Sequence, residues 1–218
     1  MINRWKHITG EILWDPKAIE QKSMEIIEMH IQGSAFGAAE RDVIKRIIHT
    51  TGDPDIIDAV RIHPEATRSG IRSLRSGCNI ITDVNMLKAG INMKKVGEYG
   101  GDIICKIADS DTEQAAKEWG ITRSAASMRL LGKQLDNAVL AIGNAPTALF
   151  EVLDLYERGI AKPAMIIGTP VGFVGAAESK ELLLAMGEIP SITIRGTRGG
   201  STIAVSAVNA LLYFQGDI

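Results

Sequence analysis

The residues MIIGTPVGFVGAAESK, Met165 to Lys180, carry the clearest strand–loop–helix pattern in the chain. The apolar run Met165–Ile167 leads into a loop with three glycines and a proline, and a helical pattern opens at Ala176. Glycine has no Cβ, so such a loop lets the backbone approach a ligand closely, and the first N–H groups of the helix favour an anion. The spacing matches neither a dinucleotide fingerprint nor a P-loop, and a plain strand-to-helix connection explains the loop equally well.

The same alternation continues on both sides of this stretch. Short apolar runs rich in β-branched residues are separated by helical patterns, which predicts a parallel sheet covered on both faces. The expected strands are Cys78–Val84, Ile103–Ile107, Val139–Ile142, Met165–Ile167 and Ile192–Ile194. The expected helices between and after them are Glu113–Leu131, Pro146–Arg158, Ala177–Met186 and Ser201–Tyr213.

The N-terminal third has a different pattern. Asp15 and Pro16 are a good N-cap and first helical residue, and helical periodicity continues to about Gly33. Two further helices are expected over Ala38–Thr50 and Pro64–Ser76. We therefore predict one domain over residues 1–218, with a mainly helical part (1–77) followed by an alternating strand–helix part (78–218).

Composition excludes several classes of protein. The net charge of −2 argues against a nucleic-acid binder that works by bulk electrostatics. Cys78 and Cys105 form no CxxC, so no disulfide framework or zinc site is expected. The first ten residues, MINRWKHITG, hold no apolar signal segment, and the apolar run Ile203–Phe214 is too short to span a bilayer. We expect a cytoplasmic protein without membrane contact.

Candidate ligand-binding residues follow the ends of the expected strands, where α/β sheets bind ligands. The loops Gly143–Thr147, Gly168–Gly175 and Gly196–Ser201 should lie on one edge and form a wide cleft rich in N–H donors. Taken singly, each basic residue near them is most simply a solvated surface charge, but the shared edge favours a binding role. The substrate-binding candidates from this edge are Asn144, Thr147, Gly172, Lys180, Arg198, Gly199 and Ser201.

His49 stands out among the four histidines. On a helical wheel, Val43, Ile44, Ile47 and Ile48 share one face, and His49 lies on the opposite, polar face with Arg46. It is therefore not a core histidine, although a plain surface histidine at its own helix end remains an open interpretation. The helix dipole favours the imidazolium there, whereas Arg46 disfavours it unless an anionic ligand lies between the two. A protonated histidine in this setting is a candidate general acid.

No metal site is expected, because the histidines form no ligand cluster by spacing. His7 and His63 lie in irregular surroundings and carry no functional signal.

Six motifs in a consistent order, spread over nearly the whole chain, together resemble the precorrin-8X methylmutase family of corrinoid (vitamin B12) biosynthesis. They are RIIHTTGD (Arg46–Asp53), TRSAAS (Thr122–Ser127), IGNAPTALF (Ile142–Phe150), PVGFVGAAESK (Pro170–Lys180), RGTRGGST (Arg195–Thr202) and AVNAL (Ala207–Leu211).

The resemblance implies a homodimeric isomerase that moves a methyl group from C11 to C12 of precorrin-8X, or of cobalt-precorrin-8, to give hydrogenobyrinate or cobyrinate. It implies a flavodoxin-like, doubly wound, five-stranded parallel sheet, with the N-terminal helices as an extension. The family's catalytic histidine corresponds to His49, as proton donor and acceptor, and its substrate contacts correspond to Ser23, Arg46 and Arg123. No cofactor is expected, since any cobalt arrives in the substrate. A shift of this kind needs no nucleophile, but protonation of the ring by His49 would polarise its π-system.

Alternatives remain from other classes. A corrinoid-binding or carrier protein would hold the same ligand without chemistry, and a nucleotide-binding α/β protein is disfavoured by the missing fingerprints. The segment TDVNMLKAGIN (Thr82–Asn92) resembles the cobalt-using branch of the family more closely than the metal-free branch.

Overall fold

The computed structural model describes residues 12–217 and groups the chain into two compact units, residues 1–35 and 36–218. The first unit contains α2 (Pro16–Ile31), and Asp15 caps it as predicted by accepting a hydrogen bond of 2.7 Å from the N–H of Ala18. His7 and the segment MINRWKHITG lie outside the described residues. The assignment of one domain to residues 1–218 stays a prediction.

The second unit is built on a six-stranded sheet with the order β1-β6-β5-β4-β2-β3. The five strands from β2 to β6 are parallel and confirm the predicted doubly wound architecture. Counted along the chain among themselves, they have the order 2-1-3-4-5, which is the flavodoxin-like order. The strands are β1 (Val60–Ile62), β2 (Ile80–Thr82), β3 (Ile103–Ile104), β4 (Val139–Ile142), β5 (Met165–Gly168) and β6 (Ser191–Ile194).

The expectation of five strands, all parallel, was wrong by one. β1 pairs antiparallel with β6, with Val60 opposite Ile194 and Ile62 opposite Ile192. Its three residues lie between a 3₁₀ turn, η1 (Pro54–Ala59), and the loop that contains Pro64. A strand this short, on an edge and flanked by prolines, has too little alternation to show in the sequence.

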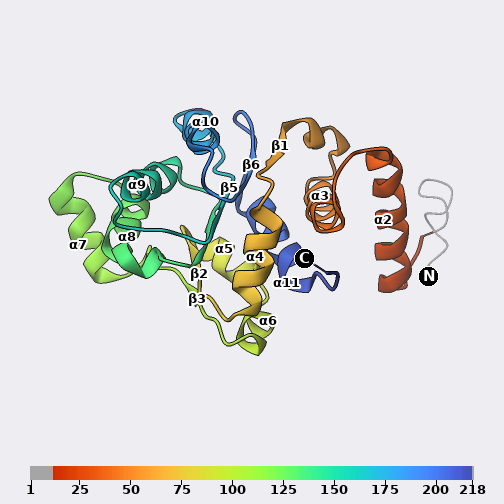
Figure 1. The fold of residues 1–218 in the computed structure, drawn as a ribbon, viewed down its shortest axis with the longest axis horizontal. Coiled ribbons are helices and arrows are strands. Elements are labelled where there is room, and N and C mark those ends of the chain that lie inside the picture. The colour runs from red at the N-terminus through yellow and green to blue at the C-terminus, as the bar shows by residue number, and fades with distance from the viewer. Residues whose placement is uncertain (1–11, 218) are drawn as a thin grey trace. The chain divides into compact units, whose positions relative to one another are not determined.

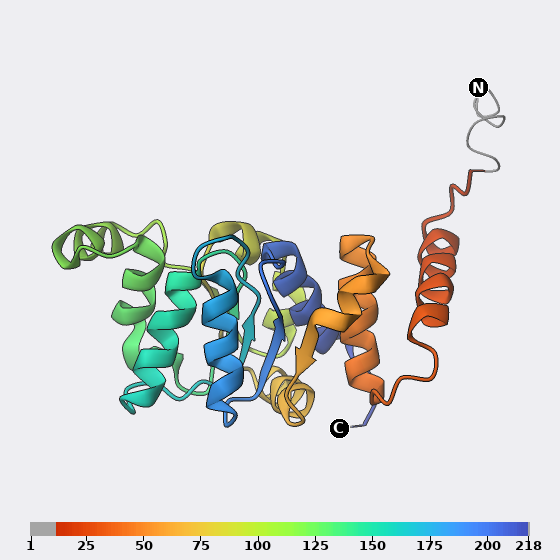
Figure 2. The same cartoon turned by 90° about the horizontal axis from the view of Figure 1, so that it is seen from above.

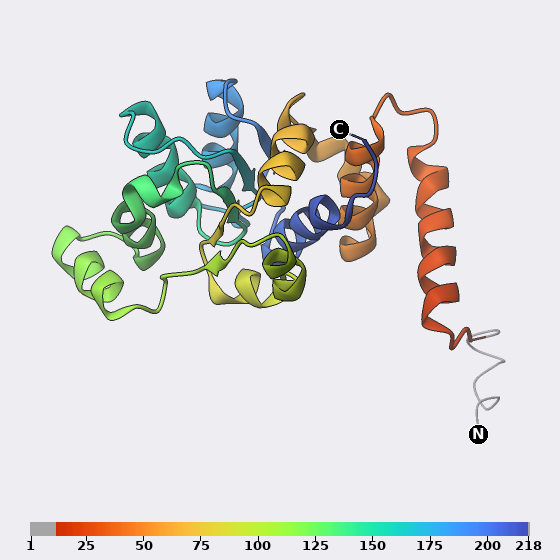
Figure 3. The ribbon, with the colours of Figure 1, turned by 60° about the horizontal axis from the view of Figure 1, so that its bottom comes forward.

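Helices cover both faces of the sheet. One face carries α8, α9 and α10, which stand side by side in Figure 2, and the other carries α4, α5 and α11 (Figures 1 and 3). α3 packs on α11. The helices of this unit are α3 (Ala38–Thr51), α4 (Ala66–Arg75), α5 (Asn85–Gly90), α6 (Met93–Glu98), α7 (Ser110–Trp119), α8 (Arg123–Leu131), α9 (Pro146–Glu157), α10 (Ala176–Met186) and α11 (Ser201–Tyr213), with a second 3₁₀ turn, η2 (Gly132–Leu135).

The strands are buried on both faces, as a parallel sheet between helices requires. Leu140, Ile142 and Ile166 join the apolar core formed with α8, α9 and α10. On the other face the helices approach very closely, since a Cβ built on Gly70 of α4 would lie 2.3 Å from the sulfur of Met165 and 2.9 Å from a methyl of Leu211. Gly70 therefore lets α4 lie against both the sheet and α11.

Two helical predictions need correction. The single helix expected over Glu113–Leu131 is two helices, because Gly120 ends α7 in the left-handed conformation and Thr122 caps α8. The short helices α5 and α6 were not predicted, since six residues give too little periodicity to detect.

Among residues 12–217, no helix is both long and apolar enough to cross a membrane.

Candidate active site

The C-terminal end of α3 presents His49 to solvent. At the start of α3 the N–H of Gly37 donates to Glu40, and at its end Gly52 adopts a left-handed φ of 65°. The predicted apolar face is buried in full, and His49 and Arg46 are exposed on the opposite side. The prediction that His49 is not a core histidine is therefore confirmed.

His49 and Arg46 open onto a pocket of about 640 Å³, a volume typical of sites for small molecules. Three parts of the chain build it: α3, α11, and the segment from Met86 to Asn92, which contains most of α5. The lining residues are Arg46, His49, Thr50, Met86, Ala89, Gly90, Ile91, Asn92, Ser201, Thr202, Val205, Ser206, Asn209 and Tyr213.

One stripe of α11 forms the floor of this pocket. Its six lining residues recur at helical spacing from Ser201 to Tyr213, and five of the six carry a polar group. The rest of α11 is strongly apolar and buried, so the polar stripe marks the side that faces the pocket.

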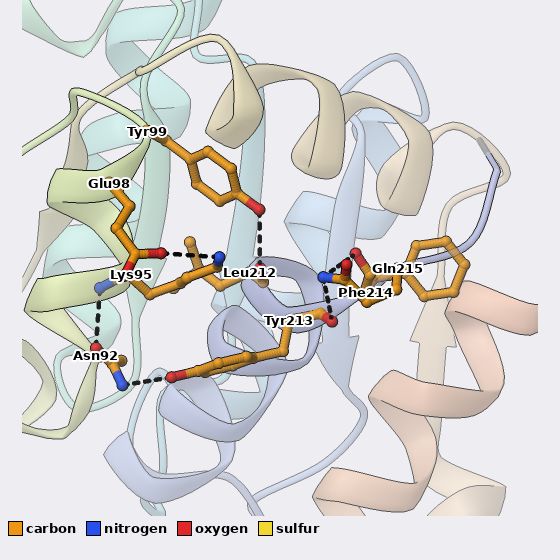
Figure 4. A network of polar contacts seen from close by, with 8 residues as sticks. All are labelled: Asn92, Lys95, Glu98, Tyr99, Leu212, Tyr213, Phe214 and Gln215. Carbon is orange, nitrogen blue, oxygen red and sulfur yellow. Dashed lines mark hydrogen bonds and ion pairs between the residues drawn. The ribbon is translucent and has the colours of Figure 1, made fainter.

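The wall opposite α3 is fixed to α11 by hydrogen bonds. Asn92 donates from its side chain to the Tyr213 hydroxyl at 2.5 Å (Figure 4), and from its backbone N–H to Oδ1 of Asn209 at 3.1 Å. The Asn209 amide in turn donates to the carbonyl of Gly90. These contacts, together with the close approach of Gly90 to Val205, hold the segment from Met86 to Asn92 against the helix.

The charge of the pocket suits an anion. Among its lining residues, Arg46 is permanently cationic, His49 is titratable and none is a carboxylate. Cations placed in a concave site attract anionic ligands and orient their carboxylates.

Asp83 organises the loop that follows β4. Its carboxylate is fully buried and accepts three backbone hydrogen bonds, from Gly143 at 3.1 Å, Asn144 at 2.9 Å and Ala145 at 2.7 Å. Burial raises the pKa of the Asp83 carboxyl, and the three N–H donors oppose that rise. Asp83 directly follows β2, so this contact crosses the β2/β4 junction where the strand order reverses.

The three glycine-rich loops meet on one edge of the sheet, as predicted. The N–H of Gly200 donates to the carbonyl of Thr169 at 2.8 Å, and the N–H of Gly172 donates to the carbonyl of Thr197 at 3.1 Å. A Cβ on Gly143 would lie 2.7 Å from the Cα of Ser201. The first loop is thus packed against the start of α11, where the pocket begins.

Lys180 occupies a different environment from the one expected. It lies in the second turn of α10, is fully buried, and its ammonium donates to the carbonyl of Arg198 at 2.6 Å. Burial lowers the pKa of Lys180 to about 8. The contact ties the Gly196–Ser201 loop to α10, and Lys180 does not line the pocket.

The structure brings three of the predicted site residues into the pocket: His49, Arg46 and Ser201. Arg198 is exposed and paired with Asp53. Gly172 and Gly199 lie in the Gly168–Gly175 and Gly196–Ser201 loops, which are hydrogen-bonded to each other.

Three other candidates lie at the N-terminal ends of α8 and α9. The hydroxyls of Thr147 and Thr122 are hydrogen-bonded at 2.7 Å. Arg123 follows Thr122 as the first residue of α8, and Asn144 is exposed just before α9. Thr147 and Thr122 line a separate cavity of about 660 Å³. Ser23 lies on α2, in the unit of residues 1–35. Binding roles for these residues stay predictions.

Sequence reasoning did not identify the segment from Met86 to Asn92 as part of the site, and of the α11 stripe it identified Ser201 alone. A signal existed for α11, because Ser, Thr and Asn recur at helical spacing in an otherwise apolar helix. The segment from Met86 to Asn92 gave no comparable signal, since it enters the site only through its hydrogen bonds to α11.

Within residues 12–217, no group of three or more His, Cys, Asp or Glu side chains is arranged to hold a metal ion.

Comparisons with known proteins point to one family. A family model described as precorrin-8X methylmutase matches residues 18–214. Cobalt-precorrin-8 methylmutase of Priestia megaterium is 42% identical over 196 residues, which cover 90% of this chain and 87% of the relative. Precorrin-8X methylmutase of Pseudomonas aeruginosa is 39% identical over 198 residues, covering 90% and 95%. The crystal structure of precorrin-8X methylmutase from Thermus thermophilus superposes with a TM-score of 0.81 at 29% identity, covering 89% and 96% of the two chains.

Proposed function

The chain belongs to the precorrin-8X methylmutase family, isomerases of cobalamin biosynthesis, and on that premise we propose that it moves a methyl group from C11 to C12 of a corrinoid ring. The substrate is precorrin-8X or its cobalt form, cobalt-precorrin-8, and the product is hydrogenobyrinate or cobyrinate.

The observation that carries this proposal is the pocket itself. A histidine and an arginine from α3 face a concave surface without carboxylates, built by the polar stripe of α11. A large ring with several carboxylate side chains needs such a surface, with Arg46 to attract a carboxylate and donors such as Ser201 and Thr202 on the pocket floor.

His49 supplies the chemistry in this proposal. The methyl group leaves C11 and bonds to C12 of the same molecule, so no atom is gained or lost and no nucleophile is required. A proton given by the imidazolium to the ring polarises its π-system, and the same imidazole takes the proton back once the methyl group has moved. The exposed position of His49 in the pocket suits this exchange.

Several finer points belong to the same proposal. Arg46, Ser23 and Arg123 contact the substrate, and the loop residues Asn144, Thr147, Gly172, Gly199 and Ser201 supply further contacts. The enzyme works in the cytoplasm as a homodimer and needs no cofactor, with any cobalt carried in the substrate.

The decisive experiment compares the wild type with His49→Ala on precorrin-8X and on cobalt-precorrin-8. We expect the wild type to change the visible spectrum of at least one of them as product forms. Loss of a general acid typically lowers kcat by about 10²- to 10⁴-fold, so His49→Ala should bind the ligand but turn it over at least about a hundredfold more slowly.

Two results would contradict the proposal. No spectral change with either substrate would remove the isomerase assignment and leave a corrinoid-binding or carrier protein. Turnover that survives in His49→Ala would remove His49 as the acid while leaving the reaction itself in place.

A further inference from the structure

An ion pair just outside the pocket lining joins the end of α3 to the loop that precedes α11. Nη1 of Arg198, in the loop before α11, lies 2.5 Å from Oδ2 of Asp53, which follows the end of α3. Asp53 is four residues beyond His49, and Arg198 is three residues before Ser201. The pair therefore links the helix end that carries the histidine to the loop that opens the pocket floor.

Asp53 is also anchored to its own segment by hydrogen bonds. Its second oxygen, Oδ1, accepts from the N–H of Asp55 at 3.0 Å, and its own N–H donates to the Thr51 hydroxyl at 3.3 Å. That hydroxyl donates back into the last turn of α3, to the carbonyls of Ile47 and Ile48. A displacement of Asp53 would thus be transmitted to the turn that holds His49.

Arg198 is anchored on the other side. Its carbonyl accepts from the buried Lys180 ammonium, and a Cβ on the next residue, Gly199, would lie 2.3 Å from the carbonyl oxygen of Thr169. The backbone at Arg198 is therefore held by α10 and by the β5 loop. The Arg198 side chain connects this fixed backbone to Asp53, which follows the end of α3.

We propose that Asp53 and Arg198 are a pair of positioning residues, which set the place of His49 relative to the pocket floor of α11. This inference rests on the proposed function. It also changes the role predicted for Arg198, whose guanidinium acts on the substrate through Asp53 and α3 rather than by binding a substrate carboxylate.

Stability alone does not account for the pair. The Arg198 and Asp53 side chains are 48% and 36% exposed, and ion pairs in such surroundings add little to folding. A misplacement of about 1 Å in an active site, by contrast, lowers a rate by as much as about a hundredfold.

Asp53→Asn is the sharpest variant, because an asparagine keeps one oxygen for the N–H of Asp55 while it removes the ion pair. We expect Asp53→Asn and Arg198→Gln each to lower kcat by about tenfold or more with KM changed less than about twofold. The double variant should be no slower than either single variant. Asp53→Glu, which keeps the carboxylate, should recover part of the rate.

Glu181→Gln is the matched control. Glu181 pairs with Arg195 of the same loop at 3.1 Å, and their side chains are 50% and 49% exposed, but the pair does not reach α3. We expect this variant to keep the wild-type kcat. A raised KM in Arg198→Gln together with an unchanged kcat in Asp53→Asn would overturn the inference, since Arg198 would then bind substrate directly.

A second readout does not depend on turnover. The ring resonances of His49, assigned with His49→Gln, should move in the same way in Asp53→Asn and Arg198→Gln and stay unmoved in Glu181→Gln. If the wild type turns over neither substrate, the proposed function fails while these resonances still decide the positioning role. Unmoved His49 resonances in both pair variants would overturn it.

Discussion

Single buried charges shape the loops around the pocket. Asp83 and Lys180 are both fully buried, and each forms hydrogen bonds with backbone groups of a loop. Asp83 accepts from three N–H groups, and Lys180 donates to one carbonyl. Buried charges are costly unless they are hydrogen-bonded. At these two positions the loops themselves provide the partners.

Asp83→Asn should destabilise the protein by about 2–3 kcal/mol, measured by urea unfolding. An asparagine offers one oxygen to three N–H donors, so its amide group would face at least one N–H without an acceptor. Asp154→Asn is the control, because Asp154 is 52% exposed and forms its ion pair with Arg158 one turn away. That change should cost no more than about 0.5 kcal/mol. Equal losses in both variants would contradict the role given to Asp83.

Lys180 should make stability rise with pH. Its pKa is about 8 in the folded protein, against a usual value of 10.5. Between these values the unfolded chain binds the proton and the folded one does not, so the free energy of unfolding increases with pH. At about 1.4 kcal/mol per pH unit, the full window is worth about 3 kcal/mol.

Lys180→Met tests this directly. Urea unfolding of the wild type and the variant at pH 7.5, 9 and 10 should show the wild type gaining on the variant as pH rises. Other titrating groups, such as Cys78, whose pKa burial raises to about 11, are common to both proteins and cancel in the comparison. Parallel stability curves would show that the ammonium is not buried in solution.

At the scale of elements, the pocket depends on how closely α11 starts beside β4. A Cβ on Gly143 would lie 2.7 Å from the Cα and 3.0 Å from the N of Ser201, and neither atom belongs to a flexible side chain. Helix α11 therefore begins where it does only because residue 143 has no side chain.

Gly143→Ala should push the start of α11 away from β4. We expect a loss of about 1–3 kcal/mol, typical of overpacking, and a lower turnover because Ser201 lines the pocket. Gly97→Ala is the control: Gly97 lies in α6, and apart from its own helix backbone and chain neighbours no heavy atom is within 4 Å of its added Cβ. In a helix that change should stabilise by about 0.5–1 kcal/mol. A stable and fully active Gly143→Ala would show that the contact is not tight.

At the scale of the molecule, the pocket joins segments from residues 46–50, 86–92 and 201–213. A ligand that binds there binds only the folded chain, so it should raise the unfolding temperature by linkage. Product at about 100 times its Kd stabilises by about 2.7 kcal/mol, which corresponds to roughly 5–10 °C for a chain of this size.

The pattern across variants separates binding from chemistry. Calorimetry should show the full shift in His49→Ala, whose role is proton transfer, and a reduced shift in Arg46→Ala, which loses the cation of the pocket. An unchanged shift in Arg46→Ala would remove Arg46 from the binding site.

The sequence determined the architecture and the pocket's histidine. Alternating runs predicted the five parallel strands, whose residues are apolar because both faces are covered. The helical wheel of α3 placed His49 on the open side, because four isoleucine and valine residues fix which face is buried. Glycine-rich loops after successive parallel strands had to meet on one edge.

Tertiary structure alone decided which of these parts share a pocket. The antiparallel edge strand β1 and the wall from Met86 to Asn92 depend on pairing with β6 and α11, which are more than a hundred residues away in the chain. Lys180 and Arg198 look like ligands in the sequence, but burial and an ion pair give them structural partners. Periodicity records only which face of an element is apolar, whereas the partner of a polar side chain is set by packing between distant segments.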